Sequence, residues 1–155
     1  MNALPAEGAE AVLLECCGSA EWARRMAARR PFGSEAAALD AGDRIWKSLF
    51  PVDWLEAFRA HPRIGDFSVR GQTAAEQAGA RNAPEAVQDA LGEANLAYEE
   101  RFGYIFIVCA SAKSAEEMLD LCRRRLDNDP VAELAVSAEE QRKITRLRME
   151  KLFAS

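Results

Sequence analysis

Residues 84–103 read PEAVQDALGEANLAYEERFG, and no other stretch of the chain indicates a helix as clearly. Its apolar residues recur at the spacing of one helical face from Pro84 to Arg101, and Gly103 follows as a stop signal. Asn95 falls on that apolar face. Because a buried amide needs hydrogen-bond partners, we expect Asn95 to bind a neighbouring backbone segment.

Similar signals on both sides of this stretch predict that the rest of the chain is mainly helical. Apolar residues at helical spacing, serines at helix starts such as Ser34 and Ser114, and prolines mark seven further segments. The expected helices cover residues 10–17, 19–29, 34–49, 51–60, 73–78, 114–126 and 131–153. The 155 residues contain no repeat, low-complexity tract or linker, so we expect one domain over residues 1–155.

Residues 104–109, YIFIVC, interrupt the helical pattern with a run of β-branched and aromatic side chains. Periodicity alone does not separate a buried strand from a buried extended segment in so short a run. No second clear strand is available to pair with it. We therefore expect a buried extended segment whose free backbone groups can bind a ligand rich in hydrogen-bond donors and acceptors.

The composition is that of an ordinary water-soluble globular protein, with 49% apolar and 29% charged residues. The net charge of −5 argues against nonspecific binding to nucleic acid or to acidic membranes, because both need a basic surface. No run is apolar and long enough to span a bilayer. Residues 1–10 lack the basic start and apolar centre of a signal peptide, so we expect a cytoplasmic protein.

The four cysteines are Cys16, Cys17, Cys109 and Cys122. They show no CxxC spacing and have no histidine near them, which argues against a zinc site. Adjacent cysteines rarely bridge each other, and a protein without an export signal is kept reduced. We interpret all four as small apolar packing residues.

His61 is the only histidine, and it lies in the run HPRIGD at residues 61–66. Imidazole is the one side chain whose unperturbed pKa lies close to neutral pH, so His61 is the first candidate for acid–base chemistry. Pro62 disfavours helical geometry at His61, and Gly65 permits a tight turn. The pattern therefore places His61 at the end of the preceding helix. A solvent-exposed or capping histidine remains an alternative.

The last expected helix contains an arginine in an unusual position. At about 100° per residue, one face of the helix is apolar, and Arg148 falls within it. That face is formed by Leu134, Ala138, Ile144, Met149 and Leu152. The charged residues expected on the solvated side are Arg142, Lys143, Arg146 and Glu150. An arginine on an apolar face needs an anion or dense hydrogen bonding, which a substrate or a structural salt bridge can supply.

Glu76 is the third candidate. Thr73, Ala74, Ala75 and Glu76 match a capping box, in which the glutamate only accepts a hydrogen bond from a backbone amide. Gln77 beside it has the character of a polar surface residue. The local pattern thus leaves a structural and a catalytic role for Glu76 open.

Taken in order, these residues resemble the 2-oxo-4-hydroxy-4-carboxy-5-ureidoimidazoline (OHCU) decarboxylases of urate breakdown. The resemblance runs from Arg30-Pro31-Phe32 to the last helix. Its specific elements are the run at residues 61–65, Glu76-Gln77, Asn95 with Tyr98, residues 101–103, Arg125-Leu126, Asn128, Glu133, and residues 144–148. It implies an all-α fold, which we expect as a single-domain bundle of about seven to nine helices with one short extended buried segment near residues 104–109.

The resemblance also implies an activity: decarboxylation of OHCU to (S)-allantoin, with no metal or organic cofactor and in a homodimer. By matching position, the catalytic residues are His61, Glu76 and Arg148. The substrate-contacting residues are Pro62, Thr73, Ala74, Ala75, Glu76, Gln77, Phe106, Ile107, Val108, Cys109 and Ala110. The residue types suit this chemistry, because it needs an anchor for an anion, donors to ring carbonyls and a positioned proton. Two alternatives remain: a non-catalytic helical interaction module, or another small ureide-processing enzyme.

Overall fold

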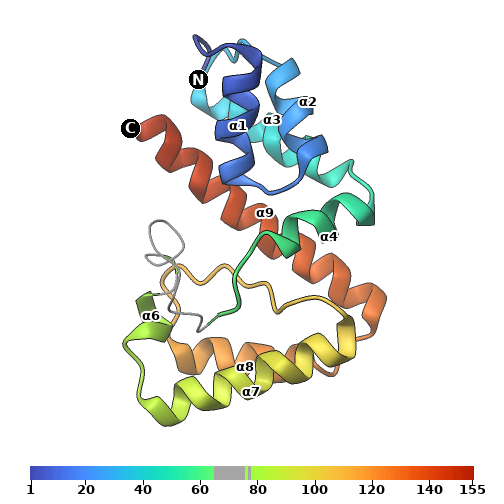
Figure 1. Cartoon of the computed structure of the whole chain (residues 1–155), viewed down its shortest axis with the longest axis vertical. Coiled ribbons are helices and arrows are strands. Elements are labelled where there is room, and N and C mark those ends of the chain that lie inside the picture. The colour runs from blue at the N-terminus through green and yellow to red at the C-terminus, as the bar shows by residue number, and fades with distance from the viewer. Residues whose placement is uncertain (65–75, 77) are drawn as a thin grey trace. The chain divides into compact units, whose positions relative to one another are not determined.

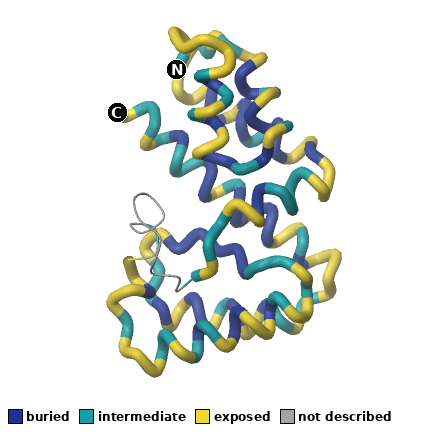
Figure 2. Tube along the Cα trace, viewed as in Figure 1, coloured by how far each residue is buried: buried dark blue, intermediate teal, exposed yellow. Residues whose placement is uncertain are grey.

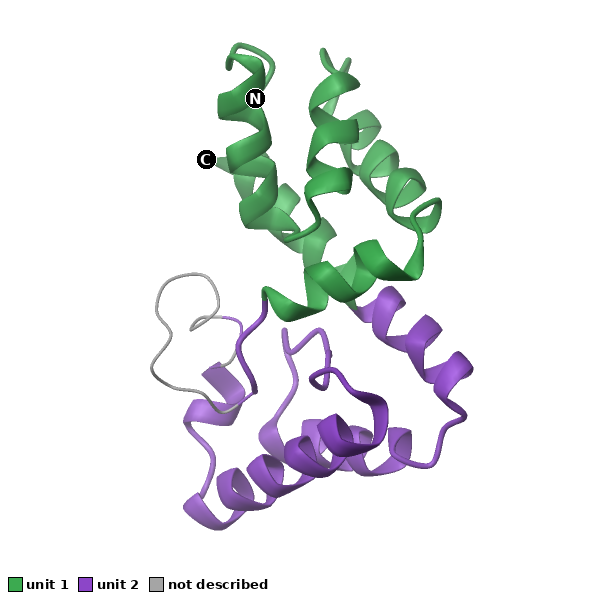
Figure 3. Cartoon of the chain, turned by 45° about the vertical axis from the view of Figure 1, so that its right-hand side comes forward, with its two compact units in different colours: residues 1–60, 141–155 green, residues 61–140 purple. Residues whose placement is uncertain are grey.

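The computed structural model describes residues 1–64, 76 and 78–155 (Figure 1). These residues form eight α-helices and no strand, so the all-α prediction is confirmed. They group into two compact units, residues 1–60 with 141–155 and residues 61–140 (Figure 3). We call them unit 1 and unit 2. None of the described helices is both long and apolar enough to cross a bilayer.

Unit 1 contains the first four helices and the end of the last one. The helices are α1 (Ala6–Cys16), α2 (Ala20–Ala28), α3 (Glu35–Lys47), α4 (Pro51–Arg59) and residues 141–154 of α9 (Pro130–Ala154). Serines begin α2 and α3 as expected: Ser19 accepts from the Trp22 amide and Ser34 from the Ala37 amide. The expected start of α1 at residue 10 was four residues too late, because the helix already begins after Pro5.

The core of unit 1 lies between α1, α2 and α3, which pack against one another in sequence order. Trp22 is fully buried and donates its indole N–H to the Gly42 carbonyl of α3 at 3.0 Å. Gly42 has no side chain, so α3 also accommodates the Trp22 ring and Met149 at this point. The indole is thus packed on its apolar sides and satisfied at its one polar atom.

Asp43 on α3 joins two arginines of α9 within unit 1. Its carboxylate lies 3.0 Å from Arg142 Nη1 and 2.7 Å from Arg146 Nη1. The two arginines are one helical turn apart, so both reach the same carboxylate. The expectation that Arg142 and Arg146 lie on a solvated face was wrong for this reason, and both side chains are partly buried.

Unit 2 contains α6 (Ala78–Arg81), α7 (Glu85–Phe102), α8 (Ala115–Arg125) and residues 130–140 of α9. Helix α7 is the segment that the sequence indicates most clearly, and it ends at Gly103 in the left-handed conformation (φ +79°). Helices α7 and α8 pack against each other. The extended segment after Gly103 adds Phe106, Val108 and Ala110 to the same apolar core. Figure 2 shows which parts of the backbone are buried.

All four cysteines are free and buried, as the sequence predicts. Burial raises the pKa of the Cys16 and Cys122 thiols to about 11 and that of Cys17 to about 12. At pH 8 these three thiols therefore stay protonated, and the thiol is a poor nucleophile compared with the thiolate.

We expect the native protein to react with a disulfide reagent such as DTNB at least about tenfold more slowly than the urea-unfolded protein, because of this protonation and the burial. The measurement is the absorbance of the released thiolate at pH 8, with the unfolded chain giving four thiols. A fast reaction of three or more thiols in the native protein would contradict the packing role.

Candidate functional site

His61 is the first residue of unit 2, and it lies just beyond α4. Helix α4 ends at Arg59 with Ala60 as its C-cap, and residues 61–63 are not helical. The His61 side chain is half-buried, with a partner in the structure. The prediction that His61 is presented at a helix end is confirmed.

Helix α7 holds the backbone that follows His61. The Asn95 side-chain amide donates to the Ile64 carbonyl at 2.9 Å, which confirms the expected role of Asn95. One turn later on α7, the Glu99 carboxylate lies 2.9 Å from Arg63 Nε. Asn95 is buried, whereas Arg63 is exposed, so the amide contributes more to fixing this turn.

Glu76 has a helical backbone just before α6, and its side chain is half-buried. Gly79 on α6 lies very close to the turn that follows the extended segment. A Cβ atom at Gly79 would be 2.3 Å from the Lys113 carbonyl oxygen, a distance that real Cβ atoms do not adopt. Glycine therefore allows the helical turn beyond Glu76 to rest directly on this backbone, a feature that sequence reasoning missed.

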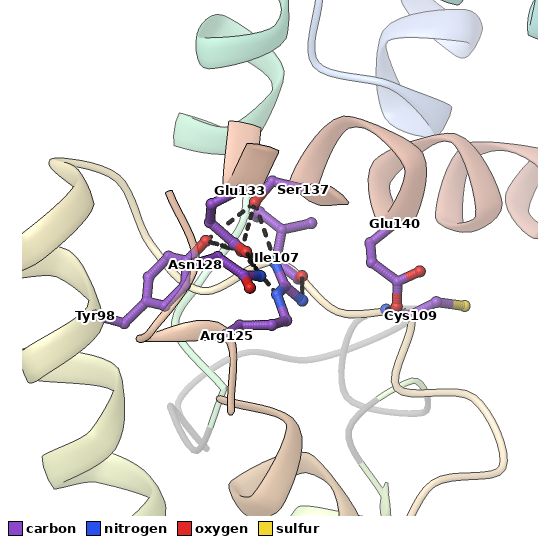
Figure 4. A network of polar contacts seen from close by, with 8 residues as sticks. All are labelled: Tyr98, Ile107, Cys109, Arg125, Asn128, Glu133, Ser137 and Glu140. Atoms are coloured by element: carbon purple, nitrogen blue, oxygen red, sulfur yellow. Dashed lines mark hydrogen bonds and ion pairs between the residues drawn. The ribbon is translucent and has the colours of Figure 1, made fainter. Parts of the chain in front are cut away.

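Residues 106–110 are all buried, and three of their peptide groups are held by charged side chains, two of which are drawn in Figure 4. The Ile107 carbonyl accepts from Arg125 Nη1 at 2.7 Å. The Cys109 amide donates to Glu140 Oε1 at 3.4 Å, and the Cys109 carbonyl accepts from Lys113 Nζ at 2.8 Å. The expected extended segment is thus confirmed, and buried side chains fix it in place of a second strand.

Arg125 belongs to a buried polar network between α7, α8 and α9 (Figure 4). Its Nε donates to Glu133 Oε1 at 2.7 Å and its Nη2 to Ser137 Oγ at 3.1 Å. The Tyr98 hydroxyl donates to Glu133, and burial together with this bond raises the pKa of the tyrosine. The side-chain amide of Asn128 donates to the second oxygen of Glu133 at 2.9 Å.

Sequence reasoning did not assign a role to this network. Glu133 and Ser137 are four residues apart on α9, which is about one helical turn. This spacing places them on one face of the helix, and it was the only sign in the sequence that they could bind the same partner. A fully buried carboxylate requires a cation beside it, and Arg125 supplies it.

Arg148 belongs to unit 1, where its side chain is half-buried on α9. It lies close enough to the end of α1 for its positive charge to oppose the pKa increase that burial causes at Cys16 and Cys17. Arg148 has a partner in the structure. The buried residues of α9 in unit 1 are Gln141, Ile144, Thr145 and Met149, so the buried face of this helix is more polar than the sequence predicts.

The candidate residues are therefore distributed over both units. His61, Pro62, Glu76 and residues 106–110 lie in unit 2, and Arg148 lies in unit 1. Thr73, Ala74, Ala75 and Gln77 lie outside the described residues, so the capping box at Glu76 stays a prediction. Within the described part of the chain, no group of three or more histidine, cysteine, aspartate or glutamate side chains is arranged to hold a metal ion.

A sequence model of one protein family, OHCU decarboxylase, matches residues 2–150. The chain belongs to the OHCU decarboxylase family. It is 42% identical over 148 residues to the uric acid degradation bifunctional protein TTL of Arabidopsis thaliana. That match covers 90% of this chain but only 45% of the plant protein, so the chain spans less than half of that relative's length.

Two further members of the OHCU decarboxylase family resemble the chain over most of their length. The OHCU decarboxylase of Amia calva is 33% identical over 80% of this chain and 75% of its own. A crystal structure of OHCU decarboxylase, determined in the presence of (S)-allantoin, superposes with a TM-score of 0.84. It shares 40% identity and covers 92% of this chain and 96% of the other. A structure of (S)-allantoin synthase, at 18% identity and a TM-score of 0.71, shares the fold.

Proposed function

We propose that this protein decarboxylates OHCU to (S)-allantoin in the breakdown of urate. The observation that carries the proposal is the likeness to the OHCU decarboxylase crystallised with (S)-allantoin, which extends over nearly the full length of both chains. The family match over residues 2–150 supports it independently.

The reaction breaks the bond between a ring carbon and its carboxylate and releases carbon dioxide. The electron pair of that bond passes into the conjugated system of the ring and forms an enol. The neighbouring ring carbon, which bears the ureido group, then takes up a proton, and the hydroxyl of the decarboxylated carbon loses its proton to become a carbonyl. Hydrogen bonds to the ring carbonyls stabilise the negative charge as it develops. A proton delivered to one face gives a single enantiomer.

Each part of this chemistry has a candidate in the chain. His61 transfers the proton, and Glu76 orients the imidazole or stabilises its protonated form. Arg148 anchors the anionic substrate, since a guanidinium binds a carboxylate through two parallel hydrogen bonds. Residues 106–110 offer backbone donors and acceptors to the ring, together with Pro62 and residues 73–77. Asn95 on α7 binds the backbone of the turn after His61. This contact supports the role of His61 as proton donor, because a general acid must be fixed in place.

Glu76→Gln separates the catalytic from the capping role. Glutamine is accepted at the last position of a capping box, so the variant should unfold within roughly 0.5 kcal/mol of wild type. A neutral amide cannot accept a proton and stabilises a charged imidazole less, so turnover should fall at least about tenfold. Thermal unfolding and initial rates measure the two effects. An enzyme of normal activity would leave Glu76 as a helix cap.

We also propose that the active protein is a cytoplasmic homodimer that needs no metal or organic cofactor. The buried free cysteines agree with a reducing compartment. Light scattering gives the mass in solution, against 17.1 kDa for one chain. Activity that survives exhaustive chelation would support the absence of a metal, and recovery of a chelated, inactive sample by added metal would contradict it.

The test of the function is to generate OHCU enzymatically from urate in the presence of this protein. Circular dichroism then follows the chirality of the allantoin, while absorbance follows the rate. OHCU also decays unaided to racemic product, so an active protein must both accelerate the decay and give one enantiomer. Unchanged decay would favour a non-catalytic interaction module, and turnover of another ureide in a substrate panel would favour the second alternative.

A further inference from the structure

Charged side chains bind the backbone on either side of Val108. Arg125 binds the Ile107 carbonyl and Glu140 binds the Cys109 amide (Figure 4). Val108 itself is buried. Among the described residues, neither its amide nor its carbonyl has a hydrogen-bond partner.

Because peptide groups are planar, these contacts also fix the directions of the Val108 amide and carbonyl. The Ile107 carbonyl and the Val108 amide belong to one peptide group, as do the Val108 carbonyl and the Cys109 amide. Both groups are trans, so the two polar atoms of each group point in opposite directions. Arg125 therefore directs the Val108 N–H away from the buried network, and Glu140 directs the Val108 carbonyl away from its own carboxylate.

Arg125 is itself held by several contacts. Its guanidinium binds Glu133 and Ser137 as well as Ile107, and it lies 4.6 Å from the centroid of the Phe106 ring. It thus contacts the segment twice, at a carbonyl and at a side chain. A planar, fork-shaped donor can make these contacts together, whereas the ammonium of lysine cannot.

We propose that Arg125 is a positioning residue that fixes the Ile107–Val108 peptide so that Val108 presents its amide to the substrate, beside the Val108 carbonyl that the Glu140 contact directs. The matching ligand group is a neighbouring carbonyl and N–H on a ring, as in a cyclic urea or imidazolone. Such a group pairs with one backbone N–H and C=O as two strands do. A buried donor and acceptor cost free energy when unpaired, which favours a ligand that satisfies both. This inference rests on the proposed function.

The kinetic test compares Arg125→Lys with Ser137→Ala. The lysine keeps a positive charge beside Glu133 but loses the fork and the Phe106 contact. Ser137 lies in the same network, bonded to Arg125 Nη2 and to the Tyr98 hydroxyl at 3.0 Å, and in the described part of the chain its side-chain hydrogen bonds do not reach residues 106–110. It is therefore the matched control for loss of network stability.

We expect Arg125→Lys to lower kcat/KM for OHCU at least about tenfold more than Ser137→Ala does, and to weaken binding of (S)-allantoin by a similar factor. The comparison is made on folded protein, with the fraction folded taken from circular dichroism. Equal losses in the two variants, in step with their loss of stability, would show a structural role only and overturn the proposal.

A second measurement needs no variant and so stands even if Arg125→Lys fails to fold. The amide resonance of Val108 in ¹⁵N-labelled wild-type protein should shift on titration with (S)-allantoin, because its N–H gains a hydrogen bond. The Cys109 amide, already bonded to Glu140, is the internal reference and should shift less. A Val108 resonance that does not move while allantoin binds would overturn the proposal.

The two proposals fail in different ways. If the wild type neither accelerates OHCU decay nor binds (S)-allantoin, the proposed function is wrong and Arg125 has nothing to position. If the wild type is active and binds (S)-allantoin, but Val108 does not shift and Arg125→Lys matches Ser137→Ala, the function stands and only the role of Arg125 is rejected.

Discussion

His61→Ala and His61→Asn are expected to fold normally and to lose at least about a hundredfold in the rate of OHCU decarboxylation. The stability expectation follows from the position of His61 beyond the last helical residue of α4. The turn that follows is held through the Ile64 backbone, so the substitution leaves the Asn95 contact in place. The rate expectation follows because no other side chain in the chain titrates near neutral pH unless perturbed.

Arg63→Ala is the matched control for His61. Arg63 lies in the same turn, is exposed, and pairs with Glu99 on α7. If the turn matters only as a scaffold, Arg63→Ala and His61→Ala should have similar effects on the rate. If His61 transfers the proton, only the histidine variants should lose activity, and any residual reaction should give racemic allantoin at the uncatalysed rate. Near-normal turnover and a single enantiomer from His61→Ala would remove His61 from the mechanism.

The local parts of the fold could be predicted because their causes lie within a few residues. Ser19, Ser34 and Ser114 each accept a hydrogen bond from the backbone amide three residues later, as helix caps do. Gly103 ends α7 in a conformation that glycine adopts without strain. The buried extended segment was also predictable, since an apolar β-branched run without a partner strand has few other places to lie.

Parts that depend on contacts between distant residues could not be predicted in the same way. Asp43 pairs with Arg142 and Arg146, which are 99 and 103 positions away, and a helical projection of α9 assigns these arginines to solvent. Gly79 has a role only because the Lys113 carbonyl lies against it. Neither contact could be predicted from the local sequence, because helical periodicity shows which residues share a face but not which distant residues pack against that face.

In the candidate site, too, some residues could be identified from the local sequence and others only from the fold. His61 and Arg148 stood out because each violates a local expectation, the first as the only histidine and the second as a charge on an apolar face. Arg125 violates none, because an arginine in the last turn of a helix is favoured by the helix dipole. Its burial against Glu133 and Ile107 is visible only once the chain is folded.

Arg148→Met should give a stable protein with a large loss of kcat/KM. Methionine keeps the length of the stem and suits a half-buried position, so the free energy of unfolding should change by no more than roughly 1 kcal/mol. Removing the partner of a buried anion costs about 2–5 kcal/mol, which corresponds to a loss of roughly thirty- to several-thousandfold in kcat/KM if the anion is the substrate.

Arg146→Met is the matched control, because Arg146 lies two positions away on the same helix and pairs with Asp43. Its loss breaks a structural ion pair, so Arg146→Met should unfold at a lower temperature while the folded fraction keeps normal kcat/KM. Arg148→Met should show the opposite pattern. If Arg148→Met instead unfolds early and its folded fraction is fully active, Arg148 is a structural residue like Arg146. The substrate anion must then be bound by another cation, because the charge of OHCU does not change with the variant.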